Sequence, residues 1–142
     1  MSSWSDRALP APLVLRVREI RVLLLSHDRR FLRVATFLLR RKGFDVRTAT
    51  STQLALELVE RHAADVVVLD GNGSPADAAR SLAGLEALCP SAAVVVVTEE
   101  DAPALRRFRL LPKWSAAERL ATEVERAYFR LGPTHDAETD TC

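Results

Sequence analysis

The fold of this chain is decided by the segment Val66-Val67-Val68-Leu69-Asp70-Gly71-Asn72-Gly73. It joins a short apolar run to one carboxylate and then to small residues typical of turns. An apolar run of this length between turn residues predicts a strand buried on both faces, as in the centre of a parallel sheet. An acid at the end of such a strand lies at the carboxyl edge of the sheet, where open α/β folds bind their ligands. Asp70 is therefore the first candidate functional residue.

The rest of the chain alternates between predicted strands and helices. We expect strands over 20–26, 44–48, 65–70, 92–98 and 108–111, and helices over 29–42, from Ser51 or Thr52, over 75–88 and over 115–131. The span 99–107 is short and contains Pro103, so a fourth helix can have only a turn or two. This alternation predicts an α/β fold of (βα)5 type: a parallel five-stranded sheet, with right-handed crossovers, between two layers of helices.

Composition limits the size and the class of the protein. The chain has 142 residues, 48% of them hydrophobic and 27% charged, with a net charge of +1. This suits one domain over 19–131, with an N-terminal arm over 1–18 and a disordered tail over 132–142. The charge balance argues against nucleic acid as a partner, and the apolar runs are too short to cross a membrane. The N-terminus lacks the apolar core of a signal peptide, so we expect a cytoplasmic protein.

From about residue 20 to residue 131 the chain resembles the receiver domain of bacterial response regulators. The resemblance is clearest in Thr48-Ala-Thr-Ser-Thr-Gln-Leu-Ala-Leu-Glu-Leu58 and in Ala64-Asp-Val-Val-Val-Leu-Asp70. It implies a flavodoxin-like fold with the strand order 2-1-3-4-5.

The resemblance also implies roles for three residues. Asp70 corresponds to the phospho-acceptor, Thr98 to the switch hydroxyl on the fourth strand and Lys113 to the lysine that contacts the phosphoryl group. A carboxylate that attacks a charged phosphoryl group needs such cations to offset the repulsion. Each residue also has a structural alternative: Asp70 as a hydrogen-bonded acid at a strand end, Thr98 as a hydroxyl bonded to the next turn, and Lys113 as a solvated lysine at a helix start.

The metal-binding positions of the family are altered in this chain. The first strand usually ends in two adjacent acids, but here Ser26-His27 stands there and Asp28 follows. Asp28 could bind a metal together with Asp70 and Asn72, or it could be the N-cap of the next helix. His27 could instead serve a softer metal. Mg²⁺ is the one cofactor that the resemblance implies, and the altered ligand set argues against it.

Three further departures affect the loops. The family's Lys-Pro after the fifth strand is reversed to Pro112-Lys113, and Gly71–Pro75 replaces the usual hydrophobic-proline pair. A one-place shift could turn the lysine away from the site. The shortened fourth helix alters the usual output face and predicts less cover over a set of apolar residues, which could support a homodimer. These residues are Val95, Val97, Phe108 and Leu110.

Three functional hypotheses follow. The leading one is an atypical, degenerate receiver domain of two-component or phosphorelay signal transduction that acts as a phosphate-independent protein-interaction module. The alternative is a receiver that autophosphorylates on Asp70 from a histidine kinase or a small phosphodonor. A third, a small α/β enzyme or nucleotide binder, lacks a Gly-rich phosphate loop after the first strand. We therefore expect no enzyme, and a partner that is a signalling protein, either a histidine kinase or an output protein.

Overall fold

The computed structural model describes residues 19–114 and 119–130. The expected arm over 1–18, the tail over 132–142 and the start of the last helix lie outside the described residues.

Five parallel strands form one sheet in the order β2-β1-β3-β4-β5. The strands are β1 (Arg21–Leu25), β2 (Asp45–Ala49), β3 (Val66–Asp70), β4 (Ala93–Val97) and β5 (Arg109–Leu111). The helices are α3 (Arg29–Arg41), α4 (Thr52–Arg61), α5 (Pro75–Leu88) and α6 (Leu120–Arg130), and a single 3₁₀ turn, η1 (Pro103–Leu105), replaces the fourth helix. The predicted fold class, strand order and shortened fourth helix are thus confirmed; β2 begins and ends one residue later than predicted.

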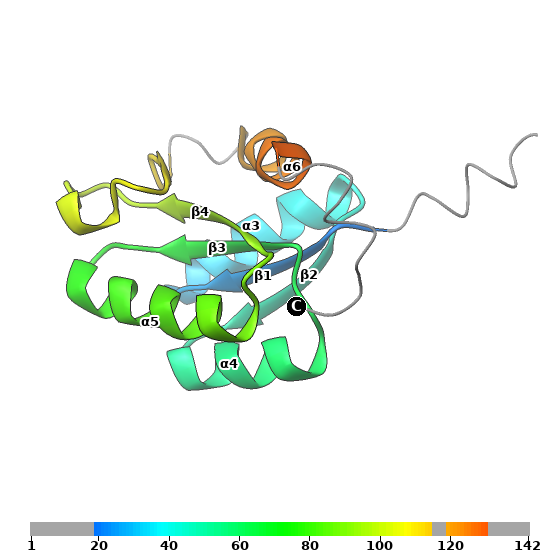
Figure 1. Ribbon diagram of the computed structural model, residues 1–142. Helices are drawn as coiled ribbons and strands as arrows, with labels where there is room; N and C mark the ends of the chain where they lie inside the picture. The colour runs from blue at the N-terminus through cyan, green and yellow to red at the C-terminus, as the bar shows by residue number, and fades with distance from the viewer. Residues whose placement is uncertain (1–18, 115–118, 131–142) are drawn as a thin grey trace, which may run out of the picture.

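Helices cover both faces of the sheet, with α4 and α5 on one side and α3 and α6 on the other (Figure 1). The deciding segment is buried as its sequence predicts. Val66 and Val68 pack in the core beneath α3 and α6, while Val67 and Leu69 pack in the core beneath α4 and α5. All four are at most 2% exposed. Asp70 therefore ends a strand that packing holds on both faces.

The 3₁₀ turn η1 packs directly over the residue that follows Asp70. Leu105 is fully buried, and a Cβ atom on Gly71 would lie 3.1 Å from its Cδ1 and 3.3 Å from Cγ1 of Val96. These distances are too short for ordinary packing, so Gly71 allows the close approach of η1. A larger residue at this position would require these two side chains to move by a few tenths of an ångström.

The prediction that the shortened fourth helix leaves four apolar residues less covered is wrong for the two valines of β4. Val95 and Val97 are at most 1% exposed, because they face the core that α3 and α6 cover. Phe108 and Leu110 lie on the other face and are only half-buried. Any homodimer contact would therefore involve Phe108 and Leu110, without the two valines.

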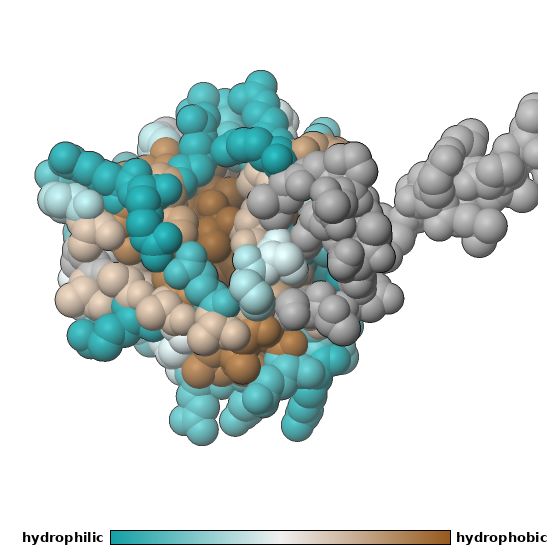
Figure 2. Space-filling view, viewed as in Figure 1, coloured by the Kyte–Doolittle hydropathy of each residue, from teal (hydrophilic) through white to brown (hydrophobic). Residues whose placement is uncertain are grey.

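Hydrophobic surface is visible in the middle of the face shown in Figure 2, framed by hydrophilic side chains. Within the described residues, no helix combines the length and apolar character needed to span a membrane.

Candidate functional site at the carboxyl edge of the sheet

Asp70 lies at the end of β3 with its side chain only 6% exposed. Its Oδ2 accepts a hydrogen bond of 2.6 Å from Oγ of Ser26 and lies 2.8 Å from Nζ of Lys113. Its Oδ1 accepts a bond of 3.0 Å from the backbone N–H of Asn72. Both carboxylate oxygens are thus engaged by donors from this chain.

Lys113 is the cation at the centre of the site. Its side chain is 5% exposed, and Nζ lies 2.8 Å from Oδ2 of Asp70 and 2.9 Å from Oδ2 of Asp28. The ammonium also lies 5.4 Å from the centre of the Phe31 ring and 5.5 Å from that of Trp114. Burial lowers the pKa of Lys113, but hydrogen bonds to Asp70 and Asp28 outweigh it and raise the pKa above its ordinary value.

The interpretation of Lys113 as a solvated lysine is therefore wrong. The reversed Pro112-Lys113 order still brings the ammonium into the site. Lys113 lies two residues after Leu111, the buried last residue of β5, and alternate positions along a strand point to the same side.

Asp28 is the N-cap of the helix that follows it, as one of its two alternatives predicted, and it also binds Lys113. Its Oδ1 accepts hydrogen bonds from the backbone N–H groups of Arg30 and Phe31, so Asp28 is the N-cap of α3. Its Oδ2 is free to turn inward and binds Lys113. The hydrogen bond from Lys113, followed by that from Phe31, lowers the pKa of Asp28 below its ordinary value.

Ser26 is a site residue whose role the sequence did not reveal. Its side chain is buried, its hydroxyl donates to Asp70, and the same oxygen accepts the backbone N–H of Asp28 at 2.9 Å. A neutral hydroxyl thus binds the carboxylate at a position where the receiver family usually places an acid. The only signal in the sequence is a small polar residue directly after a buried apolar run. His27, which follows it, is exposed.

The loops after β3 and β4 are joined through the side chain of Asn72. Its Oδ1 accepts hydrogen bonds from Oγ1 of Thr98 at 2.8 Å and from the backbone N–H of Glu99 at 2.7 Å. Oγ1 of Thr98 also accepts the backbone N–H of Glu100 at 3.0 Å. The geometry therefore matches the alternative in which Thr98 bonds to the following turn, and its switch role stays a prediction.

Two glutamates connect these loops further. Oε1 of Glu100 accepts the backbone N–H of Gly73, whose positive φ of 95° suits glycine alone among common residues. Oε2 of Glu99 accepts the backbone N–H of Trp114 at 2.8 Å. The segments that follow β3, β4 and β5 are thus joined to one another by side chains. An acidic run after a strand is usually solvated, so the sequence gives no clear signal for these bonds.

The oxygen atoms at this site are not arranged as the ligands of a Mg²⁺ ion. Mg²⁺ requires close to six oxygen ligands in near-octahedral geometry. Asp28 and Asp70 both direct an oxygen at the ammonium of Lys113, and the Asn72 side-chain oxygen faces Thr98 and Glu99. Among the described residues no group of three or more acidic, histidine or cysteine side chains could hold a metal. The carboxylate oxygens of Asp28 and Asp70 instead bind the ammonium of Lys113. A metal role for Asp28, Asp70 and Asn72 stays a prediction.

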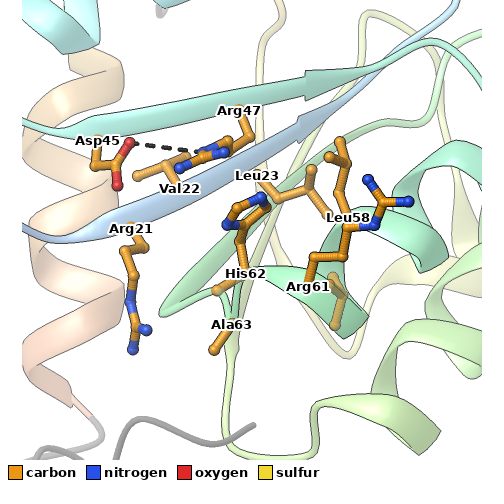
Figure 3. A pocket seen from close by; sticks show the side chains of 11 residues that line it. Arg21, Val22, Leu23, Asp45, Arg47, Leu58, Arg61, His62 and Ala63 are labelled. Carbon is orange, nitrogen blue, oxygen red and sulfur yellow. Dashed lines mark ion pairs between the residues drawn. The ribbon is translucent and has the colours of Figure 1, made fainter.

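Cavities lie at both edges of the sheet. At the carboxyl edge a shallow cavity of about 310 Å³ is lined by Asp28, Asp70, Lys113 and their neighbours, beside one of about 470 Å³ between β1, β3 and the first turn of α5. At the amino edge a cavity of about 310 Å³ contains Arg21, Arg47 and Arg61. Figure 3 shows their guanidinium groups pointing in different directions, so they do not converge on one ligand.

Of three comparisons with known proteins, the one with solved structures identifies the fold. No family model and no curated protein sequence matches this chain. Solved structures match well: the fold is that of response regulator receiver domains.

Three of these structures show how far the likeness extends. A receiver domain protein (CheY-like) from Methanospirillum hungatei JF-1 has a TM-score of 0.72 at 16% identity and covers 80% of this chain and 97% of its own. A receiver domain protein from Clostridium thermocellum has a TM-score of 0.67 at 24% identity and covers 78% of this chain and 95% of its own. The receiver domain of a response regulator named NarL from Mycobacterium tuberculosis has a TM-score of 0.66 at 23% identity and covers 79% of this chain and 98% of its own. This chain therefore spans nearly the whole of each matched domain.

Proposed function

We propose that this protein is an atypical receiver domain that acts in signal transduction as a protein-interaction module without needing phosphate. The observation that supports this most directly is the contact of Lys113 with both Asp70 and Asp28, beside a serine that donates to Asp70. An internal ammonium thus occupies the space between the two carboxylates at this edge of the sheet.

The chemistry of phosphoryl transfer supports the same proposal. Attack on a phosphoryl group needs a free lone pair on a carboxylate oxygen and enough positive charge to offset the repulsion between two anions. Oδ2 of Asp70 already accepts from Ser26 and Lys113, and Oδ1 accepts from Asn72. Three donors thus already occupy three of about four acceptor positions of this carboxylate.

The linked loops provide a surface that a partner can recognise in one fixed state. Asn72, Glu99 and Glu100 hold the segments after β3, β4 and β5 together. A prearranged surface loses little conformational entropy on binding, which favours affinity. We propose a signalling protein as the partner, either a histidine kinase or an output protein, and the bacterial cytoplasm as the compartment. We propose no enzymatic activity; a homodimer would use Phe108 and Leu110.

A second candidate function is phosphorylation of Asp70 by a histidine kinase or a small phosphodonor. It is favoured by the types of side chain at this edge of the sheet, namely a carboxylate that ends β3, a threonine that follows β4 and a lysine that follows β5. In this case Asp28 would exchange the ammonium for a metal ion.

Intact mass spectrometry separates the two candidates. Wild type, Asp70→Asn and Ser26→Asp/His27→Asp, which restores two adjacent acids, are incubated with Mg²⁺ and phosphoramidate. We expect no phosphoryl adduct on the wild type and an adduct on the double variant. An adduct on the wild type that is absent from Asp70→Asn would establish the second candidate instead. Circular dichroism confirms that each variant is folded.

A further inference from the structure

Helix α3 carries one continuous basic stripe on its outer side. The stripe consists of Arg29, Arg30, Arg33, Phe37, Arg40 and Arg41, all exposed, and is called here the arginine face. At 100° per residue these six positions fall within an arc of about 120°. The opposite side of the helix is buried through Phe31, Leu32, Ala35 and Leu39. Packing therefore accounts for the inner side of α3 and leaves the arginines unexplained.

Local helix energetics also fails to explain the first half of this stripe. Arg29 and Arg30 lie in the first turn of α3, where the helix dipole disfavours cations, and the carboxylate of the N-cap Asp28 is bound to Lys113. Arg33 is four residues from Arg29 and three from Arg30, so these like charges repel one another on adjacent turns. These three neighbouring arginines lower the stability of the helix, so their presence indicates a role other than folding.

The second half of the stripe has a partial structural explanation. Arg40 and Arg41 lie at the C-terminal end, where cations are favourable, and Arg40 donates to the carbonyl of Val46. The guanidinium of Arg41 lies 5.5 Å from the centre of the Phe37 ring. Phe37 itself is 60% exposed, which is unusual for a phenylalanine in the middle of a packed helix.

The charges of the arginine face are not neutralised within the described residues. None of its arginines forms an ion pair there; Arg30 instead lies 5.5 Å from the centre of the Trp114 ring. With Lys42 directly after it, α3 holds six of the 20 basic residues. The remaining 14 basic residues stand against 19 acidic ones, so the rest of the chain has a net charge of −5. Almost a third of the basic residues thus lie on, or directly after, one helix that contains no acidic residue.

We propose that the arginine face binds an acidic surface of a partner protein, with Phe37 inserted in an apolar recess between the partner's carboxylates. Guanidinium groups bind carboxylates in a bidentate manner, and arginine and aromatic residues are enriched at the centre of protein interfaces. The exposed Phe37 ring between two arginine pairs favours protein over nucleic acid, because a phosphate backbone offers no recess for it. This surface does not involve Asp70, so it is independent of the proposed function.

The test uses a defined acidic ligand in place of an unknown partner. The probe is a fluorescent helical peptide of about 20 residues, long enough to cover the 13 residues of α3, with glutamates along one side and a central pair of small apolar residues. The matched probe has glutamine for every glutamate, and a DNA duplex of similar length is the third ligand. The full chain is compared with Arg29→Gln/Arg33→Gln and Phe37→Ser. The control is Arg106→Gln/Arg107→Gln, which removes the same charge from exposed arginines elsewhere.

We expect the glutamate peptide to bind the wild type at least about tenfold more tightly than the glutamine peptide or the duplex, and more weakly as salt is raised. Arg29→Gln/Arg33→Gln and Phe37→Ser should each weaken this binding at least about fivefold, while the control changes it less than about twofold. Arg29→Gln/Arg33→Gln should melt at the same temperature as the wild type or higher. The proposal would be overturned by equal loss in the control variant, by tighter binding of the duplex, by equal binding of the two peptides, or by a lower melting temperature of Arg29→Gln/Arg33→Gln.

Discussion

The ammonium of Lys113 lies 2.8 Å from Oδ2 of Asp70, across the end of the sheet. Asp70 ends β3 and Lys113 follows β5, so the contact spans the strand between them, β4. A second carboxylate, that of Asp28, binds the same ammonium from the start of α3. Three segments distant in the sequence thus meet at one buried charge, and the balance of these charges determines how the site responds to substitution.

Replacing Lys113 by methionine should strongly destabilise the protein. The change keeps most of the side-chain volume but leaves two carboxylates close together without their shared cation, and an unpaired charge at Asp70 is nearly buried. Removing one member of a buried ion pair costs about 3–5 kcal/mol, and the partial exposure of Asp28 reduces this to about 2–3 kcal/mol. Urea unfolding at neutral pH measures the difference. The companion variant Lys113→Met/Asp70→Asn should recover much of the loss, and no recovery would show that the carboxylate repulsion is not its cause.

Much of the fold could be predicted because its signals are local. The run Val66–Leu69 is apolar at every position, and only burial on both faces explains this pattern. Asp28 was identifiable as an N-cap because it directly precedes a helical pattern, and Gly43 has the positive φ of 93° expected after a helix end. Such features depend on neighbours within a few residues.

The site could be predicted only in part because its contacts are long-range. Sequence position brought Asp70, Thr98 and Lys113 to one edge, but it could not show that Lys113 would be buried. Nor could it show that Ser26 donates to Asp70 or that Asn72 engages Thr98. These contacts join residues that lie 26 or more positions apart in the chain, so no local pattern reveals them.

The variant Ser26→Asp/His27→Asp should create a response to Mg²⁺ that the wild type lacks. Two added carboxylates beside Asp70 supply the oxygen ligands that this ion prefers. An ion that binds only the folded state stabilises it, by about 1.4 kcal/mol at a concentration ten times its Kd. We expect the melting temperature of the variant to rise with about 10 mM Mg²⁺, and that of the wild type to stay unchanged. Ca²⁺ and Na⁺ at equal ionic strength are the controls; a rise in the wild type with Mg²⁺ alone would contradict the internal-ammonium interpretation.

Replacing Asn72 by alanine should loosen the loop after β4 while the core stays intact. The change removes the acceptor for Thr98 and for the backbone N–H of Glu99 and should cost about 1–2 kcal/mol. Hydrogen exchange of the Glu99 amide should accelerate, because that amide loses its partner. The amide of Val68, in the centre of β3, is the internal reference and should lose protection only to the extent that global stability falls. Unchanged exchange at Glu99 would show that Asn72 does not hold this loop.

Replacing Asp28 by asparagine should lower stability in a manner that depends on pH. Asparagine can still cap α3, so the change removes mainly the charge that faces Lys113. The pKa of Asp28 is lowered from 3.8, so the folded state binds a proton less readily than the unfolded state. The stability from this shift is fully present above pH 3.8 and is lost as the pH falls through the folded-state pKa.

The raised pKa of Lys113 has the opposite consequence: its contribution is fully present below pH 10.5 and is lost as the pH rises through the folded-state value. At pH 7 both contributions operate, and we expect Asp28→Asn to cost about 1 kcal/mol, a small value because the carboxylate is partly exposed. The cost should shrink as the pH is lowered below 3.8 and Asp28 of the wild type becomes protonated. Urea unfolding of both proteins at several pH values measures this. The control is Asp101→Asn, an exposed acid whose loss should change stability little at any pH. A cost of Asp28→Asn that is the same at every pH would mean that the charge of Asp28, and hence its pairing with Lys113, does not stabilise the fold.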